Sequence, residues 1–277
     1  MLAYDKNKFH IYVVSLAKEK ARYFRIKQLL DKEGLLEQTT FLPAIEAQYI
    51  TSNYIKSQNY GVFPDKLWRG SGLENWYTES IKQAEIACCL GHMMGWQAQV
   101  RQQYEYALIL EDDCYWTEPI VPHIDKWLQF NSNTFSKPHE YGIFYLGRIP
   151  VAVPEFERYM DFLSIHKEEY ITEEYTRPQF SFNLQSYIMS LNFTKQLLDE
   201  HRPEKALMTP DEIIPACWME HPHKHIRERF PTITKAAALT IPNPNYPENW
   251  SIGCTWQDGT WPGITLTNLG NSPAYEY

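Results

Sequence analysis

Three consecutive acidic residues, Glu111, Asp112 and Asp113, directly follow an apolar run at residues 106–110 (YALIL). A short continuous apolar run fits a strand that is covered on both faces, as in a parallel sheet. Ligands of such sheets bind beyond the carboxyl ends of the strands, where carboxylates could hold a hard divalent cation against a diphosphate. An acidic triplet is a weak motif by itself, and three acids could equally end a strand at the solvent.

Strand geometry separates the three acids. Because side chains alternate along an extended strand, Glu111 and Asp113 should share one face, and Asp112 should point elsewhere. We therefore predict that Glu111 and Asp113 are the metal ligands. Asp112 is predicted to contact the substrate, at a sugar or a ribose.

The triplet belongs to a longer series of motifs. Residues 85–92 (EIACCLGH), a predicted helix and residues 107–113 (ALILEDD) follow one another. Around them lie 12–16 (YVVSL) with Arg22, 43–46 (PAIE), 145–148 (YLGR), 187–198, and 210–215 (PDEIIP) with His221 and Pro222. In this order the segments, from about residue 10 to about residue 240, resemble glycosyltransferase family 25, whose core pattern is G-E-x-G-C-x-x-S-H, a helix, and an apolar strand ending in E-D-D. The sequence departs from the family at Ser15, in place of Asn, and at Ala47, Ala84, Ala87 and Gly91, in place of Gly, Gly, Gly and Ser.

This resemblance implies a GT-A-like fold and an inverting enzyme that depends on Mn²⁺ or Mg²⁺. The family includes bacterial lipooligosaccharide β-galactosyltransferases and collagen hydroxylysine galactosyltransferases. The expected reaction moves a hexose, galactose or glucose, from a UDP-sugar to a hydroxyl group of a glycan, a glycoprotein or a collagen-like acceptor. Two alternatives stay open: a glycosyltransferase that acts on modified nucleic-acid bases, and a non-catalytic sugar- or protein-binding domain with the same fold.

An inverting transfer needs a general base, and the candidates are Asp211 and Glu212. Thr209 and Glu212 have the spacing of a capping box, with Pro210 at the first helical position. Glu212 can therefore fold back to the Thr209 amide, whereas Asp211 is left to face the acceptor. We predict Asp211 as the base. Plain helix-start chemistry, or a further metal or sugar contact, is the alternative role.

Donor binding is predicted at further matched positions. Three of them have a common structural alternative: a solvated helix charge for Arg22, a packing or hydrogen-bonding role for His92, and a structural ion pair for Arg148. The predicted donor-binding residues are Ser15, Leu16, Arg22, Glu85, His92, Asp112 and Arg148.

Two other sets of residues receive structural interpretations. His221, His223 and His225 look like a metal tract, but their spacing of two, interrupted by Pro222, disfavours one helical face, and we predict a surface position. The tail tryptophans could stack on an acceptor sugar or form a lid, although core packing is expected for at least two of them: Trp250, Trp256 and Trp261.

The elements that must position these residues alternate between strand and helix. Strands are predicted at 10–16, 41–44, 106–110, 142–147 and 186–190, and helices at 19–32, 80–103, 193–200 with Asn192 as N-cap, and from Thr209 onward. Residues 48–80 read as a long loop. This order indicates an α/β fold: a mostly parallel, doubly wound sheet with helices on both faces. We expect one domain at 1–240 and an extended, irregular tail at 241–277 packed on it.

Composition limits the class of partner. The chain has 26 Lys and Arg against 34 Asp and Glu, a net charge of −8, so nucleic acid is an unlikely partner. Five cysteines without regular spacing indicate reduced thiols rather than a disulfide framework. We see neither a signal peptide nor a run long enough to span a membrane. The expected location is the cytoplasm, or the host cytoplasm if the protein is viral.

Overall fold

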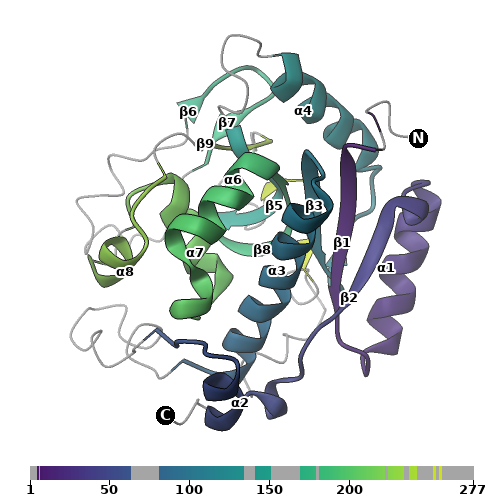
Figure 1. Cartoon of the computed structure of the whole chain (residues 1–277). Helices are drawn as coiled ribbons and strands as arrows, with labels where there is room; N and C mark the ends of the chain where they lie inside the picture. Colours follow the sequence, from purple (N-terminus) through teal and green to yellow (C-terminus); the bar gives the residue numbers. More distant parts are fainter. Residues whose placement is uncertain are drawn as a thin grey trace.

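A nine-stranded β-sheet forms the centre of the part of the chain that the computed structural model describes (Figure 1). The described residues are 5, 7–63, 81–133, 141–150, 169–178, 181–221, 224–233, 237–241, 252–253 and 256–257. The strands follow the order β2 (Thr39–Pro43), β1 (Phe9–Ser15), β3 (Tyr106–Glu111), β8 (Ser181–Ser190), β5 (Tyr141–Pro150), β9 (Ala237–Thr240), β7 (Thr176–Arg177) and β6 (Glu169–Tyr170). Outside this order β10 (Ile252–Gly253) pairs with β5, and β11 (Trp256–Gln257) pairs with β4 (Cys114–Tyr115) in a separate ribbon.

Most of the long strands point in one direction. β1 pairs in parallel with β2 and β3, and β5 pairs in parallel with β9. β8 lies between β3 and β5 and is antiparallel to both, so β3 and β5 share a direction. The carboxyl ends of β2, β1, β3, β5 and β9 therefore meet at one edge of the sheet. The mostly parallel α/β architecture is confirmed, with β8 as a reversed strand in its middle.

Helices cover both faces of this sheet. Figure 1 shows α3, α6 and α7 in front of the strands, while α1 and α4 pack on the other face. The helical segments are α1 (Lys20–Lys32), α2 (Ser52–Ser57), α3 (Gln83–Gln102), α4 (Val121–Asn133), α6 (Leu191–Gln196), α7 (Pro210–Trp218) and α8 (Lys224–Arg229). Shorter turns are η1 (Leu36–Gln38), η2 (Ala47–Tyr49), the π-helical η4 (Leu197–His201) and η5 (Pro203–Lys205).

Alternation along β1 and β3 creates two separate cores. On β3, Ala107 and Ile109 belong to the core under α3, whereas Leu108 and Leu110 belong to the core under α1 and α4. All four side chains have no exposed surface, which is why this strand reads as a continuous apolar run. The next residue in the alternation, Glu111, therefore faces α3.

Two local predictions are wrong. The predicted loop at 48–80 contains η2 and the helix α2, whose N-cap Thr51 accepts a hydrogen bond from the Tyr54 amide at 3.1 Å; residues 64–80 lie outside the described part. The helix expected from residue 193 begins at Leu191. Its cap is Ser190 rather than Asn192, because the Ser190 hydroxyl accepts the Phe193 amide at 3.3 Å.

The tail and the thiols are described only in part. Of residues 241–277, the structure describes 241 and the strands β10 and β11, so Trp250 and Trp261 lie outside it, as does the side chain of Trp256. Four cysteines are free thiols: Cys88, Cys89, Cys114 and Cys217. Cys254 lies outside the described residues.

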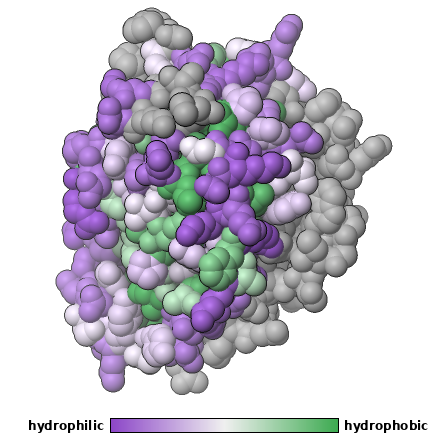
Figure 2. Space-filling view, turned by 90° about the vertical axis from the view of Figure 1, so that its right-hand side faces the viewer, coloured by the Kyte–Doolittle hydropathy of each residue, from purple (hydrophilic) through white to green (hydrophobic). Residues whose placement is uncertain are grey.

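The face that carries α1 is mostly hydrophilic, with apolar patches between polar side chains (Figure 2). Phe24 on α1 is the one large apolar residue of that helix that stands out, at 58% exposure. In the described part of the chain, no helix combines the length and the apolar character that crossing a membrane requires.

Helix α3 packs directly on β1 at a glycine. A Cβ atom added at Gly91 would lie 2.6 Å from Cγ1 of Val14, well inside a normal contact. Valine is β-branched and has little rotamer freedom, so it does not turn away easily. Gly91 therefore sets the separation between α3 and β1. The Ser that family 25 usually has here does not fit this packing.

We expect Gly91→Ala to destabilise the fold by about 1–2 kcal/mol, measured by urea unfolding. The overpacking against Val14 outweighs the roughly 1 kcal/mol that alanine gains over glycine inside a helix. In a Val14→Ala background, which removes the obstructing methyl group, the same substitution should cost less. A Gly91→Ala protein as stable as the parent would show that the helix adjusts without cost.

A second buried feature is a histidine at the end of η4. His201 is 1% exposed, and neither ring nitrogen has a hydrogen-bond partner in the described structure. Burial, aided by the positive charge of Arg229, lowers the pKa of His201 to about 4. The folded protein thus holds His201 neutral at a pH where a histidine in the unfolded chain is charged.

The stability of the fold should therefore fall as the pH drops from about 6.5 towards 4. Over this range the unfolded chain takes up a proton at residue 201 that the folded chain does not, a contribution of up to about 3 kcal/mol. Unfolding of the parent and of His201→Gln by urea at pH 7 and pH 4.5 measures it. The parent should lose about 2 kcal/mol more than the variant; equal losses would contradict the prediction.

Candidate active site

The acidic triplet lies at the carboxyl edge of the sheet, but the strand ends within it. β3 stops at Glu111, and Asp112 and Asp113 form a turn before β4. Strand alternation therefore does not extend to Asp113. The expectation that Glu111 and Asp113 share a face is wrong in its geometry: Glu111 turns to α3, whereas Asp113 lies with Asp112 beside Arg22 of α1. The proposed metal-binding role of Glu111 and Asp113 stays a prediction.

Asp112 and Asp113 meet residues from the end of β1 and the start of α1. Arg22 Nη1 lies 3.8 Å from Asp112 Oδ1 and 3.5 Å from Asp113 Oδ2. The Leu16 amide donates to Asp112 Oδ2 at 3.2 Å, and Ser15 supplies a side-chain hydrogen bond to the same carboxylate. The first motif thus supplies Ser15, Leu16 and Arg22, and the acidic triplet supplies Asp113. All four residues lie beside Asp112.

Burial explains the electrostatics of Asp112. The side chain is 6% exposed, and burial raises its pKa above the ordinary value. The hydrogen bond from Ser15, the charge of Arg22 and the Leu16 amide oppose this rise, while the charge of Glu111 adds to it. A cation near the triplet would relieve the same carboxylate repulsion, which makes this edge of the sheet suited to a positively charged ligand.

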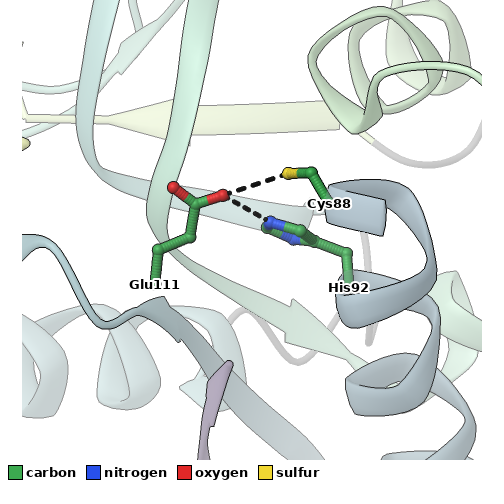
Figure 3. A group of neighbouring side chains, drawn as sticks. All are labelled: Cys88, His92 and Glu111. Atoms are coloured by element: carbon green, nitrogen blue, oxygen red, sulfur yellow. Dashed lines mark hydrogen bonds and ion pairs between the residues drawn. The ribbon is translucent and has the colours of Figure 1, made fainter. Parts of the chain in front are cut away.

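Glu111 lies on the other side, against α3 (Figure 3). Its Oε1 is 3.0 Å from His92 Nε2 and 3.3 Å from Cys88 Sγ. Burial alone would raise the pKa of Glu111, but the hydrogen bond and electrostatic attraction to His92, followed by the hydrogen bond from Cys88 and the charge of Arg22, hold it below the usual value. Glu111 is therefore kept as an anion at this position.

Cys88 is a member of the site that the sequence did not reveal as such. Its spacing of four residues from His92 on one helix was visible, and residues at this spacing lie on the same helical face. The ligand atoms of Cys88, His92 and Glu111 all lie within 4.8 Å of one another, so the three could hold a metal ion. Thiolate and imidazole ligands would favour a borderline cation such as Zn²⁺ over Mg²⁺.

Asp211, the predicted base, approaches this cluster from α7. It lies in the first turn of that helix. The pKa of the Cys88 thiol is raised well above its ordinary value, first by burial and then by the negative charges of Glu111 and Asp211. This electrostatic influence requires Asp211 to lie near Cys88. Two acids that are far apart in the sequence are thus brought into one neighbourhood.

The capping box predicted at the start of α7 does not form. The Thr209 side chain makes no cap hydrogen bond, and Glu212 Oε2 lies 2.7 Å from His221 Nε2 instead. Both partners are buried, at 2% and 0% exposure. The surface position predicted for His221 is therefore wrong, because the chain after α7 folds back and buries it against Glu212. His223 and the side chain of His225 lie outside the described part.

Three predicted donor contacts have structural partners. Glu85 accepts the backbone amide of Lys82 at 2.5 Å and so caps α3. His92 has no exposed surface, and both of its ring nitrogens are hydrogen-bonded. Arg148 is likewise fully buried and donates to Ser181 Oγ at 2.7 Å. These contacts favour the structural alternative for His92 and show that Glu85 and Arg148 have structural partners as well, while Ser15, Leu16 and Arg22 lie at the triplet.

The sequence is similar to one protein family over most of its length. The model for "Glycosyltransferase family 25 (LPS biosynthesis protein)" matches residues 8–214. A glycosyltransferase 25 family member from Aedes aegypti is 22% identical over 245 residues, which cover 86% of this chain and 36% of that protein. Procollagen galactosyltransferase 1 from Danio rerio is 19% identical over 248 residues, covering 89% of this chain and 38% of that protein.

A relative from Bos taurus has a different description, "Probable inactive glycosyltransferase 25 family member 3", and is 20% identical over 221 residues, covering 79% of this chain and 33% of that protein. The chain thus spans about a third of the length of the curated relatives it matches. Among solved structures, mannose-1-phosphate geranyltransferase from Thermus thermophilus aligns with a TM-score of 0.36 at 10% identity, covering 84% of this chain and 73% of that one. This likeness is too distant to bear on function.

Proposed function

Because the chain belongs to glycosyltransferase family 25, we propose that it is a metal-dependent enzyme that moves a hexose from a UDP-sugar to a hydroxyl acceptor. The observation that carries the proposal is the convergence of the acidic triplet with residues 15, 16 and 22 at the carboxyl edge of the sheet. In parallel α/β sheets this edge is where ligands bind. The hexose we propose is galactose or glucose.

The triplet supplies the donor set that a hard cation requires. Asp113 and Glu111 are the proposed ligands, with Asp112 beside them, and carboxylate oxygens suit Mn²⁺ and Mg²⁺. The crowding of carboxylates around a single arginine supports a site that accepts further positive charge. A bound cation would offset the negative charge that develops on the UDP leaving group.

The residues at the end of β1 are proposed to receive the nucleotide. Arg22 already spans Asp112 and Asp113, and its planar guanidinium is suited to two diphosphate oxygens. Ser15 and Leu16 present a hydroxyl and a backbone amide at the same place. We propose that Asp112 orients the donor through its contacts with these groups.

Asp211 is the proposed general base of an inverting transfer. As the acceptor hydroxyl attacks the anomeric carbon, the carboxylate of Asp211 would take its proton. The negative charge of Asp211 helps to raise the pKa of Cys88, whose thiol is hydrogen-bonded to Glu111. This supports a position of Asp211 beside the donor site. Asp211 lies in the first turn of α7, at the positive end of that helix, where a carboxylate is stabilised.

The acceptor is proposed to be a glycan or a protein, including a collagen-like chain. The name of one relative, procollagen galactosyltransferase 1, supports the collagen-like option. The net charge of −8 argues against the alternative of modified nucleic-acid bases. An array of glycans and hydroxylysine-containing peptides, probed with radiolabelled UDP-galactose and UDP-glucose, would distinguish these acceptor classes.

Incubation with UDP-galactose or UDP-glucose and Mn²⁺ tests the reaction, with released UDP as the readout. We expect release that depends on the cation and is faster with one of the two donors. A protein that releases no UDP, and whose binding of UDP in calorimetry does not depend on Mn²⁺, would contradict the proposal. Mn²⁺-dependent binding without release would favour the second candidate, a non-catalytic binding domain, which the name of the Bos taurus relative brings into consideration.

A further inference from the structure

A chain of hydrogen bonds runs through the core beneath Glu111. Trp96 Nε1 lies 2.9 Å from Tyr187 Oη, which lies 2.7 Å from His92 Nδ1. His92 Nε2 continues to Glu111 Oε1 at 3.0 Å, where Cys88 Sγ also arrives at 3.3 Å. Trp96, Tyr187 and His92 have no exposed surface. The first two residues have no place in the function proposed above.

Three elements hold this chain in place. Cys88, His92 and Trp96 follow one another at intervals of four along α3 and so share a helical face. Tyr187 lies on β8 directly opposite Ile109 of β3, on the face that α3 covers. The rings of His92 and Tyr187 stack at a centroid distance of 5.7 Å with an interplanar angle of 7°. The imidazole is therefore fixed by stacking as well as by hydrogen bonds.

The chemistry of the groups decides where each proton lies. An indole nitrogen only donates, so Trp96 donates to the Tyr187 oxygen. The single hydroxyl proton of Tyr187 then goes to His92 Nδ1, which must accept and therefore carries no proton. A ring proton of His92 is therefore placed on Nε2, from which it donates to Glu111 Oε1. The Cys88 thiol donates to the same oxygen.

We propose that Tyr187 and Trp96 are positioning residues for Glu111. Acting through His92, they impose one proton arrangement that holds Oε1 of Glu111 against α3 and directs Oε2 toward the cation. Figure 3 shows this second oxygen turned away from Cys88 and His92. The assignment of Oε2 to the cation rests on the function proposed above, whereas the proton arrangement does not.

The same proton arrangement argues against a cation held by Cys88, His92 and Glu111 together. Coordination by Nε2 would require its proton to move to Nδ1. Tyr187 would then accept from both Trp96 and His92, and its own hydroxyl proton would have no acceptor among the described residues. A buried unsatisfied donor costs about 1–3 kcal/mol. This cost disfavours a cation at the cluster, and we propose that the cluster is a hydrogen-bonded support for Glu111.

The imidazole nitrogens of His92 report the arrangement directly. Long-range proton–nitrogen NMR spectra of the apoprotein, with His92 assigned by comparison with His92→Gln, distinguish a protonated from an unprotonated ring nitrogen. We expect a proton on Nε2 and none on Nδ1. A proton on Nδ1, alone or in addition to Nε2, would overturn the proposal whether or not the protein transfers a sugar.

Tyr187→Phe removes the hydroxyl and tests the positioning role. The Nδ1 signal of His92 should shift, and Mn²⁺ binding in the presence of UDP, measured by electron paramagnetic resonance of the free ion, should weaken about 10-fold or more. Tyr145→Phe is the matched control. Tyr145 lies opposite Tyr187 on β5, is also fully buried, and its hydroxyl accepts a hydrogen bond from Trp218 Nε1 at 3.1 Å outside the chain of bonds.

Four outcomes decide between the interpretations. A loss of Mn²⁺ affinity with Tyr187→Phe but not with Tyr145→Phe supports the proposal, and equal affinities overturn it. A thiolate-to-metal charge-transfer band with Co²⁺ that disappears in Cys88→Ser would overturn it in favour of a metal centre at Cys88. If the parent protein binds no Mn²⁺ with UDP, the proposed function fails, while the NMR result still decides the proton arrangement.

Discussion

Asp113→Ala is expected to abolish the Mn²⁺-dependent part of UDP binding. The carboxylate is one of the two proposed cation ligands, and it is buried, at 5% exposure, so water does not readily replace it. Without the cation, the charge on the leaving diphosphate is not offset, and kcat/KM should fall by at least about 10³-fold, or about 4 kcal/mol. Calorimetry with UDP, with and without Mn²⁺, and UDP-release kinetics measure the two effects.

The matched control for this substitution is Asp199→Ala, which removes an exposed carboxylate from η4. It should leave UDP binding and release unchanged. Asp113→Asn, which keeps the shape of the side chain beside Arg22, serves if the alanine variant unfolds. Retained Mn²⁺-dependent UDP binding in a folded Asp113 variant would move the cation site elsewhere.

Asp211→Asn should separate binding from chemistry. Asparagine keeps the size and the hydrogen-bonding capacity of the side chain but does not take the proton of the acceptor hydroxyl. We expect kcat for transfer to fall by about 10²–10⁴-fold, with UDP binding and the KM for the donor little changed. Steady-state kinetics with varied donor and a fixed acceptor measure this split.

The neighbouring acid tests the choice of base. Glu212 is held by the buried His221, so Glu212→Gln should weaken that pair and lower the stability of the fold by about 1–3 kcal/mol. At temperatures where the Glu212→Gln variant stays folded, its kcat should remain near that of the parent. If kcat instead falls with Glu212→Gln and not with Asp211→Asn, Glu212 is the base and the assignment of Asp211 is wrong.

The sequence predicted the elements that local patterns specify. The apolar run before the triplet became the buried strand β3, and the helical spacing at 80–103 became α3. Ser15, Leu16 and Arg22 were selected through the resemblance to the family, and their position beside the triplet follows from the adjacency of β1 and β3 in the structure. The predictions of β3 and α3 needed hydrophobic periodicity alone.

The errors arose where a side chain had more than one possible partner. Thr209 and Glu212 have the spacing of a capping box, yet Glu212 bonds to His221, which the return of the chain after α7 brings within 2.7 Å. The shared face expected for Glu111 and Asp113 from strand alternation does not form, because the chain turns directly after the strand. A sequence pattern does not show where a strand gives way to a turn.

Local sequence patterns were enough to predict a buried strand that delivers three acids to the carboxyl edge of an α/β sheet. The contacts of each acid emerge only from the packed fold: Arg22 for Asp112 and Asp113, and the hydrogen-bonded residues His92, Tyr187 and Trp96 for Glu111. The elements were predictable because strand and helix formation depend mainly on neighbours along the chain. The partners of Glu111 depend on how α3 is rotated on the sheet and on β8 lying beside β3, both of which packing over the whole core determines.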